Sequence, residues 1–547
     1  MVLSAVYLNT KTITMLFTKH NFSIQRTKLF SSLFENYIQQ DETVKPFYKY
    51  HIGKKDFETF FTEEHFNYLN RPILVESLLK QTHLVTNTSS KTVESIQLLT
   101  TENTFTVTTG HQLCLFTGPL YFIYKIISTI NLCKTLAEKF PNKNFVPVYW
   151  MASEDHDFEE INHANVFGKK VVWDSEEKGS VGNFKTENLK DVIVELKTIL
   201  GDNENATDLI KLFEDAYLKN KNLADATRYL VNELFGDFGL ITLDGNDKDL
   251  KGLFREEFKT DVFKNTSFEM VSETINQLKE KYSAQVSPRL INVFYTEQNL
   301  RERIELKNNR YHVLNTEISF SKEELETIID TTPEKLSPNV VLRPLYQQKI
   351  LPNIAYVGGP GELAYWLEYQ KLFETYSITF PILMPRHFAM IIDKGTQNKI
   401  KKLNLETESV FTDGEDLVKA FIKTEHADVN LNNFNSPLND VFNSIAELVS
   451  TIDKSLIGSV EAEKQKTLNG ILALNQKINK ALKQKSETDI NQIWAIKSKL
   501  FPNNIPQERY DNFSMYYTKY GKSFIESLVE ELNYNLDTFE YSVLVEK

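Results

Sequence analysis

Cysteine is nearly absent from this sequence. Only Cys114 and Cys133 occur among 547 residues, and their spacing matches no metal-binding motif. So few cysteines cannot form a disulfide framework, which excludes a disulfide-stabilised secreted scaffold and favours a reducing compartment. We expect both thiols to be buried, as free cysteines usually are.

An excess of basic charge is also missing. The chain has 62 Lys and Arg residues against 74 Asp and Glu residues, which gives a net charge of −12. Sequence-independent binding to nucleic acid requires a positive surface that neutralises phosphates. The composition therefore predicts no nucleic-acid partner and argues against an enzyme that handles tRNA.

Long apolar runs are missing too. The N-terminus has no basic segment, and its apolar residues are interrupted by Asn9, Lys11 and Thr12, so a signal peptide is not expected. The longest apolar stretch, 120–136, contains Lys125 and is too short and too polar to span a bilayer. We therefore expect a cytoplasmic protein without a membrane partner.

The P-loop motif G-x-x-x-x-G-K-[ST] does not occur in the chain. The segment AIKSKLF at 495–501 is similar to the lysine-rich ATP signature of class I aminoacyl-tRNA synthetases. It lies inside a predicted helical tail, and we discount it. A nucleotide would therefore need a site elsewhere.

The segment TFTVTTGHQLCLFTGPLYFIYK offers such a site. A strand containing Thr109 breaks at Gly110, and a helix is predicted to begin at Pro119, after Thr117 and Gly118. Glycines let backbone N–H groups approach a phosphate, and the positive end of the helix attracts it. A tight strand-to-helix turn without a ligand explains the same residues, so both interpretations stay open.

Strand, glycine turn and helix recur along the chain and predict an α/β fold with a Rossmann-like, doubly wound parallel sheet. Residues 15–164 would hold N-terminal helices and the first half of this core. Residues 165–340 would hold insertions around a core strand near 238–244, and residues 341–394 the second half. The candidate parallel strands lie in TFTVTTG, FVPVYWMAS, FGLITLDGND, ILPNIAYVGG and FPILMPRHFAMIID.

Two further features lie outside this core. Alternating residues on both sides of Asn308-Asn309 predict an antiparallel meander. Apolar residues recur three and four apart over 438–482, which predicts a helical hairpin or coiled coil, and with it a C-terminal α-helical coiled-coil domain over 395–547. A helix over 459–485 would be about 40 Å long and could present an apolar seam to a second subunit.

Acidic residues follow the second predicted core strand. MASEDHDFEEINH places Glu154, Asp155, His156 and Asp157 just past the carboxyl end of that strand, where open α/β sheets bind ligands. Three carboxylates so close together need a cation, a substrate amine or water. Asp155 and His156 could bind an ammonium group or act as acid and base. A solvated, acidic helix start is the alternative interpretation.

His156, Glu160 and His163 have helical spacing and could ligate zinc from one helix face, as in a metal-dependent hydrolase. The spacing is not HExxH, and no third-ligand motif is apparent, so we expect no tightly bound metal.

A second glycine turn occurs in AYVGGPGELAYWLEYQ. Gly358, Gly359 and Gly361 could form another backbone cradle, with Glu362 placed for ribose hydroxyls or a substrate amine. Core packing of the aromatic residues behind the turn is the alternative. Two arginines at candidate strand ends would suit a carboxylate or phosphate, or form surface ion pairs: Arg343 and Arg386.

Five segments together resemble the bacillithiol biosynthesis cysteine-adding enzymes: TGHQLCLFTGPLYFIYK, VPVYWMASEDHDFEEINH, SPNVVLRPL, AYVGGPGELAYW and LFPNNIPQERYDNF. The resemblance implies a class I synthetase-like Rossmann core with connective-peptide insertions and a coiled coil that forms a homodimer. It also implies a reaction that joins the carboxyl group of L-cysteine to the amino group of glucosaminyl malate, with ATP and Mg²⁺.

The resemblance further implies roles for individual residues. His111 and Gln112 fall on the nucleotide-loop motif, residues 154–157 on the substrate-pocket motif, and residues 358–362 on the second cradle. Many members have Gln-Gln where this chain has His111-Gln112. His111 would therefore either steady a phosphoryl transition state or replace a hydrogen-bonding amide.

Catalysis is assigned to His111, Asp155 and His156, with His156 taking the proton released by the attacking amine. The lysine-rich ATP loop of the synthetases is missing. A nucleotide-binding coiled-coil scaffold without ligase turnover is the alternative function.

Overall fold

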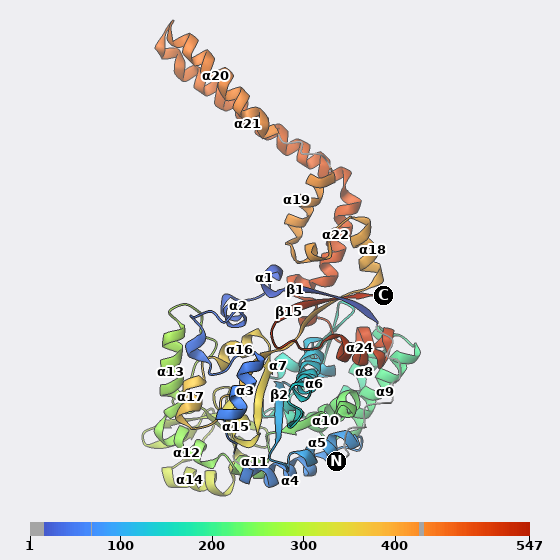
Figure 1. Cartoon of the computed structure of the whole chain (residues 1–547), viewed down its shortest axis with the longest axis vertical. Helices are drawn as coiled ribbons and strands as arrows, with labels where there is room; N and C mark the ends of the chain where they lie inside the picture. The colour runs from blue at the N-terminus through green and yellow to red at the C-terminus, as the bar shows by residue number, and fades with distance from the viewer. Residues whose placement is uncertain (1–15, 67, 426–430) are drawn as a thin grey trace. The chain divides into compact units, whose positions relative to one another are not determined.

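The computed structural model describes residues 16–66, 68–425 and 431–547. It divides into two compact units (Figure 1). The larger unit contains the described residues up to Ile391 together with Ile505–Lys547, and the smaller unit is Ile392–Asn504. The expectation that no signal peptide is present concerns residues that lie mostly outside this description.

A five-stranded parallel sheet forms the centre of the larger unit. Its strand order is β13-β12-β2-β3-β6, and each neighbouring pair is parallel. Its central strands are buried on both faces, as a sheet covered by helices requires. The predicted Rossmann-like class is confirmed. The strands are β2 (Thr104–His111), β3 (Asn144–Met151), β6 (Ile241–Asp244), β12 (Asn353–Gly358) and β13 (Ile382–Pro385).

The strand order of this sheet reverses between β2 and β12. From β2 the chain moves outward through β3 to β6, and then returns to the other side of β2 with β12 and β13. Open α/β sheets form their ligand crevice at the carboxyl ends of the strands at such a switch point. Gly110 near the end of β2 and Gly358 at the end of β12 lie on its two sides.

Helix α6 (Tyr121–Lys139) connects β2 to β3 and is buried over most of its length. It begins two residues later than predicted, because the turn before it is not helical. Phe116, Thr117 and Gly118 have φ angles of 51°, 73° and 66°. A Cβ at Gly118 would lie 2.6 Å from the Cβ of Cys114, so this turn requires glycine.

Asn512 holds this turn from a distant part of the sequence. Its Nδ2 donates to the carbonyl oxygens of Phe116 at 2.8 Å and Gly118 at 2.6 Å, and its Oδ1 accepts from the N–H of Ser514 at 3.0 Å. The side chain is fully buried. The turn is therefore filled by the protein's own polar groups.

Replacing Asn512 with Ala is expected to destabilise the protein by about 2–4 kcal/mol, because two buried carbonyls and one N–H lose their partners. The melting temperature measures this loss. Asn183→Ala is the matched control, since Asn183 is exposed and its side chain makes no hydrogen bond within the described chain. Equal melting temperatures for the two variants would contradict the role given to Asn512.

A second sheet joins the two ends of the described chain. β1 (Phe17–Ser23) pairs antiparallel with β15 (Glu540–Glu546), which lies beside β14 (Phe388–Ile392). The segment FPILMPRHFAMIID contains the predicted core strand, β13, but also a second strand, β14, which belongs to this other sheet. Between the two strands the N–H of His387 donates to Ser128 Oγ at 2.8 Å.

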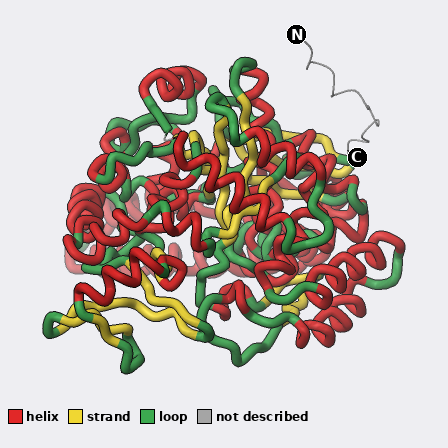
Figure 2. The backbone as a smooth tube through the Cα atoms, turned by 90° about the horizontal axis from the view of Figure 1, so that it is seen from below, coloured by secondary structure: helices red, strands yellow, loops and turns green. Residues whose placement is uncertain are grey.

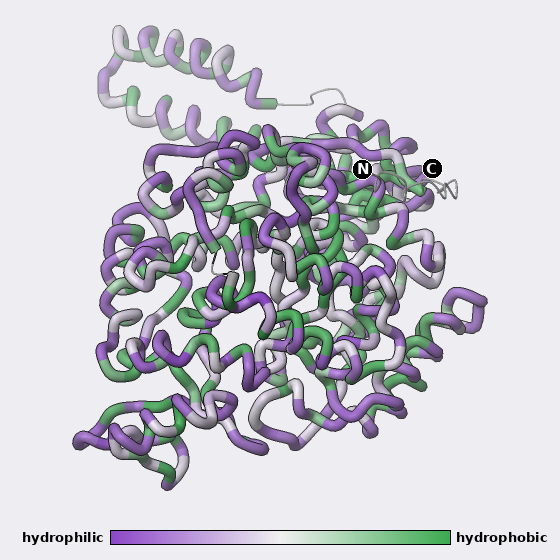
Figure 3. Tube along the Cα trace, turned by 60° about the horizontal axis from the view of Figure 1, so that its bottom comes forward, coloured by the Kyte–Doolittle hydropathy of each residue, from purple (hydrophilic) through white to green (hydrophobic). Residues whose placement is uncertain are grey.

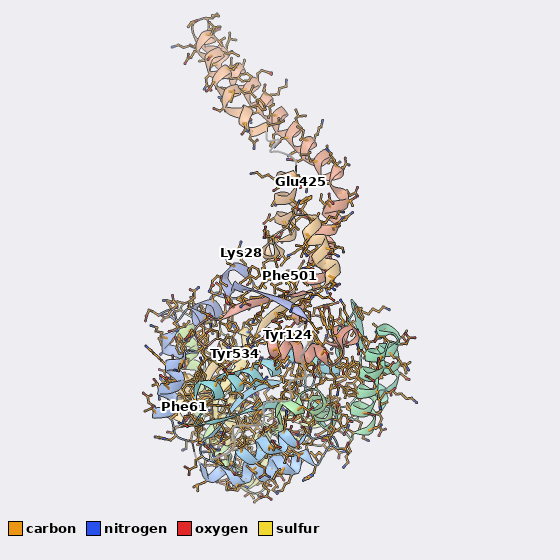
Figure 4. The ribbon with its side chains drawn as sticks, turned by 45° about the vertical axis from the view of Figure 1, so that its right-hand side comes forward. Lys28, Phe61, Tyr124, Glu425, Phe501 and Tyr534 are labelled. Atoms are coloured by element: carbon orange, nitrogen blue, oxygen red, sulfur yellow. The ribbon has the colours of Figure 1, made fainter. Side chains whose placement is uncertain are left out.

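The C-terminal boundary also differs from the predicted domain 395–547. The smaller unit ends at Asn504, and residues 505–547 belong to the larger unit. Tyr534, labelled in Figure 4, donates its hydroxyl to the carbonyl oxygen of Pro385 at 2.6 Å, and its ring lies 4.3 Å from that of His387. Helical periodicity carries no information about such long-range contacts.

Helices make up most of the regular structure (Figure 2). The N-terminal helices are α1 (Ile24–Thr27), α2 (Ser32–Ile38), α3 (Lys54–Glu63), α4 (Arg71–Thr82) and α5 (Ser90–Leu98). The insertions contain α8 (Lys190–Leu200), α9 (Glu204–Lys219), α10 (Leu223–Phe235), α11 (Lys248–Gly252), α12 (Arg255–Lys264), α13 (Thr266–Leu278), α14 (Lys322–Thr331) and the strand pair β4 (His163–Val166) and β5 (Lys169–Val172). The larger unit also contains α7 (Phe158–Ile161), α15 (Leu342–Ile350), α16 (Pro360–Trp366), α17 (Gln370–Thr375), α23 (Ser514–Tyr520) and α24 (Ser523–Glu531).

The predicted antiparallel meander is confirmed. Asn308 and Asn309 have φ angles of 52° and 58°, as a two-residue hairpin turn requires. A further strand, β11 (Leu336–Pro338), pairs with β7 on the other side. The meander consists of β7 (Val293–Glu297), β8 (Leu300–Lys307), β9 (Arg310–Val313) and β10 (Ser319–Phe320).

The smaller unit is helical, and two of its helices form the predicted hairpin. The hairpin is mostly hydrophilic, with hydrophobic segments between (Figure 3). Val441, Leu448 and Ile452 are 55%, 67% and 76% exposed, so its apolar residues are uncovered in one chain. The helices are α18 (Lys394–Lys402), α19 (Gly414–Glu425), α20 (Asn435–Ser450), α21 (Ile457–Lys485) and α22 (Glu487–Leu500). Nowhere in the described part of the chain is a helix both long and apolar enough to cross a membrane.

Candidate functional site

A cavity of about 770 Å³, here called the central cavity, opens at the switch point of the parallel sheet. One wall comes from the carboxyl ends of β2, β3 and β12, and the other comes from the meander. Many predicted site residues line it: Gly110, His111, Gln112, Glu154, Asp155, His156, Arg343, Gly359, Gly361, Glu362 and Arg386.

Four predicted nucleotide-binding residues do not line the central cavity. Thr117 and Gly118 lie in the turn that Asn512 fills. Thr109 donates its hydroxyl to the carbonyl oxygen of Val357 at 2.8 Å and so joins β2 to β12. Gly358 lies behind the wall, where an added Cβ would approach Leu363 to 2.9 Å. These positions shape the fold rather than contact a ligand in the cavity.

The second glycine turn is already bonded to a side chain of its own helix. Glu362 accepts from the N–H of Gly359 at 2.9 Å and from the hydroxyl of Tyr356 at 2.8 Å. Both its oxygens also accept from Lys125 Nζ at 2.8 Å, and Lys125 donates to the carbonyl oxygen of Gly110 as well. Burial raises the pKa of Glu362, but the Lys125 ammonium and the hydrogen bonds from Gly359 and Tyr356 together outweigh burial, so that the pKa lies below its ordinary value and the carboxylate is ionised. Glu362 and Lys125 thus brace the two glycine turns.

Replacing Lys125 with Met is expected to cost about 1–3 kcal/mol at pH 7, because Glu362, whose side chain is 25% exposed, would keep its charge but lose its ammonium partner. Because the pKa of Glu362 is lowered in the folded protein, its ionised carboxylate stabilises the wild type at any pH above the ordinary pKa of a carboxyl group. This contribution is lost as the pH falls through the folded-state pKa. In Lys125→Met the pKa of Glu362 should instead be raised, so the stability gap between the two proteins should narrow on acidification. The melting temperatures of both proteins, recorded from about pH 5 to about pH 8, measure this difference in stability.

The double variant Lys125→Met, Glu362→Gln serves as the control, since it removes both charges and should recover part of the lost stability. A stability loss that is the same at every pH, or that the second substitution does not relieve, would contradict this pairing.

His111 is a neutral imidazole at the end of β2. Burial, followed by the neighbouring Lys125 ammonium, lowers the pKa of His111 to about 3. Its ring lies 5.3 Å from that of Tyr121 and 5.1 Å from that of Phe122. A neutral ring can form hydrogen bonds but supplies no positive charge to a phosphoryl group. The geometry therefore favours His111 as a replacement for a hydrogen-bonding amide.

His156 is bonded to an arginine of the meander. Nη1 of Arg301 lies 2.6 Å from Nδ1 of His156, and a guanidinium can only donate. The neutral ring therefore carries its proton on Nε2. Burial and then the Arg301 charge lower the pKa of His156. Since neither ring nitrogen keeps a free lone pair, His156 is a hydrogen-bond donor in this arrangement and cannot take a proton as predicted.

Asp155 is the acidic residue best placed to act in the central cavity. Its Oδ1 accepts from the N–H of His156 at 2.7 Å, and its Oδ2 accepts from Gln112 Nε2 at 2.8 Å. Gln112 also donates to Glu160 Oε2 at 2.8 Å and so bridges two carboxylates. These contacts orient Asp155 without neutralising it.

The other two carboxylates of the acidic segment have structural partners. Glu154 pairs at 2.6 Å with Lys251, whose side chain is fully buried. Asp157 accepts from the N–H of Glu160 at 3.4 Å and caps α7, outside the cavity lining. The alternative interpretation, a solvated acidic helix start, therefore accounts for Asp157. Its side chain does not line the cavity, so the structure does not support the substrate-binding role predicted for it.

The zinc interpretation fails on local geometry. Helix α7 spans only Phe158–Ile161, and His163 already belongs to β4, so the three candidate ligands do not share a helix face. The described residues contain no group of three or more metal-ligating side chains. Both cysteines are buried as predicted, and burial raises the pKa of Cys114 to about 12, so that it stays a thiol.

Arg343 does not lie at a strand end as predicted. It lies in the first turn of α15, because Asn339 Oδ1 accepts from the N–H of Val341 at 2.8 Å and starts the helix. Its Nη1 donates to Gln347 Oε1 at 3.0 Å, while its Nη2 is buried without a hydrogen-bond partner. A Cβ added at Gly110 would lie 3.8 Å from Nη1. Arg343 therefore lies beside the first glycine turn.

Arg386 lies beside the second glycine turn, where a Cβ added at Gly359 would be 3.6 Å from its Nε. It follows β13 as predicted and forms a buried ion pair with Glu508 at 2.7 Å. The interpretation as a surface ion pair is wrong, because both partners are buried.

The central cavity carries more positive than negative charge. Apart from Arg386, none of its arginines has a carboxylate within 4.0 Å among the described residues. Its lysine-linked carboxylates, Glu154 and Glu362, are already neutralised. An anionic ligand is therefore expected to bind in the cavity. The arginines that line it are Arg289, Arg301, Arg303, Arg343, Arg386 and Arg509.

Comparison with known families agrees with this architecture. A family model described as "Bacillithiol biosynthesis BshC, N-terminal Rossmann-like domain" matches residues 17–387, and one described as "Bacillithiol biosynthesis BshC, C-terminal coiled-coil domain" matches residues 389–544. The chain belongs to the BshC family.

Curated relatives match this BshC-family chain over nearly its whole length. A Flavobacterium johnsoniae protein is 44% identical over 524 residues, covering 94% of this chain and 99% of the relative. A Flavobacterium psychrophilum protein is 43% identical over 522 residues, covering 94% and 98%. A Bacillus cytotoxicus protein is 27% identical over 512 residues, covering 91% and 95%. Each is named "Putative cysteine ligase BshC".

Sequence reasoning missed several cavity residues of this BshC-family chain. Lys125 had a detectable signal, since a lysine in an otherwise apolar helix needs a buried partner. Arg301 and Arg303 alternate along β8, but exposed strands commonly show the same pattern. Arg289 and Arg509 lie in segments whose approach to the cavity depends on long-range folding.

Proposed function

We propose that this protein is a carbon–nitrogen ligase that joins the carboxyl group of L-cysteine to the amino group of glucosaminyl malate, with ATP providing the activation. The observation that carries the proposal is a cavity at the switch point of a BshC-family Rossmann-like core, in which unpaired arginines surround an oriented carboxylate, Asp155. Amide formation from a free carboxylate is uphill in water, so a nucleotide is the natural source of activation.

The core side of the cavity fits a nucleotide. The buried Nη2 of Arg343 lacks a partner, and an anionic oxygen would satisfy it. Arg343 and Arg386 lie beside Gly110 and Gly359, where phosphates can approach the backbone most closely. ATP with Mg²⁺ would supply activation of the cysteine carboxyl group at this place. In this proposal, guanidinium groups bind the phosphates, whereas the sequence suggested that free backbone N–H groups would do so.

The remaining residues suit the amine side of the reaction. Asp155 accepts the proton that the amine loses on attack, because its carboxylate is oriented by Gln112 and is bonded to no lysine or arginine among the described residues. His156 donates from Nε2 to a substrate oxygen, and His111 contributes a neutral hydrogen-bonding ring.

We further propose that the protein works in the cytoplasm as a homodimer joined through the α20–α21 hairpin. The uncovered apolar residues Val441, Leu448 and Ile452 support this, since a second hairpin would remove them from water.

The test is to incubate the purified protein with L-cysteine, glucosaminyl malate and ATP, and to detect the amide product by mass spectrometry. The proposal expects product only when all three substrates are present, together with AMP or ADP. AMP would indicate adenylation, and ADP an acyl phosphate. Binding of nucleotide without any amide would instead favour a scaffold that does not turn over.

A further inference from the structure

We propose that Arg301 and Arg303 of the meander form a dicarboxylate subsite, which selects the acceptor by the two carboxylates of its malate group. This inference rests on the proposed function for the identity of the acceptor. It goes beyond that function because it assigns acceptor recognition to an insertion rather than to the Rossmann-like core.

Strand geometry places the two arginines on one face of the meander. Arg301 and Arg303 are two residues apart on β8, so their side chains point to the same side, with Cα atoms about 7 Å apart. In the register of β7 and β8, Arg303 lies opposite Phe294 and Arg301 opposite Thr296. Phe294, Arg301 and Arg303 all line the central cavity. This face of the meander is therefore the cavity wall.

The Arg301 side chain is held in place by several contacts. Its guanidinium lies 4.0 Å from the centre of the Phe294 ring, and its Nε donates to Ser337 Oγ at 3.1 Å. Arg301 is buried and has no carboxylate within 4.0 Å among the described residues, so that Glu154 and Asp155 offset its charge only from a greater distance. Arg303, beside it, is half-buried and makes no side-chain hydrogen bond within the described chain. Two guanidinium groups on one strand face, neither in an ion pair within the described chain, match a ligand with two carboxylates.

The position of this pair also connects it to the reacting amine. Nη1 of Arg301 lies 2.6 Å from Nδ1 of His156, which in turn lies 3.7 Å from Oδ1 of Asp155. An acceptor bound by its malate group at these arginines would thus extend its amino sugar toward Asp155. The arginines beside the glycine turns, Arg343 and Arg386, remain for the nucleotide.

The kinetic test compares two acceptors in the full-length protein: glucosaminyl malate and methyl glucosaminide, which keeps the amine but has no carboxylate. Arg303→Gln is the test variant, because the Arg303 side chain has no hydrogen bond to lose among the residues that the structure describes. Arg310→Gln is the matched control, since Arg310 lies on the next strand, is exposed and pairs with Glu324 at 3.6 Å.

We expect Arg303→Gln to raise the KM for glucosaminyl malate by about 10- to 100-fold and to leave kcat and the KM for methyl glucosaminide near the wild-type values. Arg310→Gln should change none of them. An unchanged KM for glucosaminyl malate, or an equal increase for both acceptors, would overturn the subsite. An increase confined to the KM for ATP would also overturn it, because the arginine would then bind phosphate.

Calorimetric titration tests the subsite without turnover. L-malate, a dianion, should bind the wild-type protein at least about 10-fold more tightly than L-lactate, a monoanion, and Arg303→Gln should abolish the difference. Equal binding of the two acids to the wild type, or no binding of malate, would overturn the inference. If no amide forms in any assay, the proposed function fails, while the titration still decides the subsite.

Discussion

Replacing Asp155 with Asn is expected to lower kcat for amide formation by about 10²- to 10⁴-fold, which is the usual contribution of a positioned general base. The amide retains most of the shape of the carboxylate and can still accept from the His156 N–H, but it cannot take the proton from the attacking amine. Steady-state kinetics with saturating substrates measure the change in kcat, and the melting temperature should stay close to that of the wild type.

Asp157→Asn provides the control for Asp155, because Asp157 belongs to the same acidic segment but caps α7 outside the cavity lining. Asparagine also caps helices well, so kcat should be nearly unchanged. If Asp155→Asn retained the wild-type kcat, or if Asp157→Asn lost as much activity, the assignment of Asp155 as the base would be wrong.

Replacing Arg343 with Ala is expected to lower kcat/KM for ATP by about 10²- to 10³-fold. This is the usual effect of removing a preorganised hydrogen-bond donor from a site where negative charge develops. Because its Nη2 has no hydrogen-bond partner in the described chain, the substitution should cost less stability than the loss of a fully bonded buried arginine. Initial rates at varied ATP concentration, with melting temperatures in parallel, separate the two effects.

Arg343→Lys should restore only part of the lost activity, since lysine keeps the charge but lacks the planar fork of donors. A complete rescue by lysine would show that charge alone matters. An unaltered dependence on ATP in Arg343→Ala would remove this residue from the nucleotide side of the cavity.

The parallel sheet could be predicted because its signals are local. Runs of β-branched and apolar residues, some of them ending at a glycine, predicted five strands, and the Asn308-Asn309 pair predicted the meander turn. The pairing of β1 with β15 could not be predicted in this way, because it joins the two ends of the described chain and depends on no short motif. Residues 505–547 were predicted to belong to the helical domain for the same reason, whereas their contacts place them in the larger unit.

The position of the candidate site could be predicted from the sequence, but the set of side chains free to bind a ligand there could not. Strand ends placed Gly110 and Asp155 correctly in the cavity, because the carboxyl ends of parallel strands meet at one edge of the sheet. Which groups remain free to bind a ligand depends on partners from distant segments. Asn512 donates a hydrogen bond to the carbonyl oxygen of Gly118, and Lys251 neutralises Glu154. Arg301 donates to Nδ1 of His156. These contacts turn a predicted acidic site with glycine cradles into a cavity dominated by arginine.

In the proposed reaction, the cavity activates the carboxyl group of cysteine with ATP and transfers it to an amine. The most direct test uses L-cysteine labelled with ¹⁸O in its carboxyl group, with mass spectrometry of the nucleotide and phosphate products. Activation moves one carboxyl oxygen to phosphorus, so one labelled oxygen should appear in AMP or in inorganic phosphate for each amide formed. Amide formation without label in either product, or nucleotide cleavage without amide, would contradict the account.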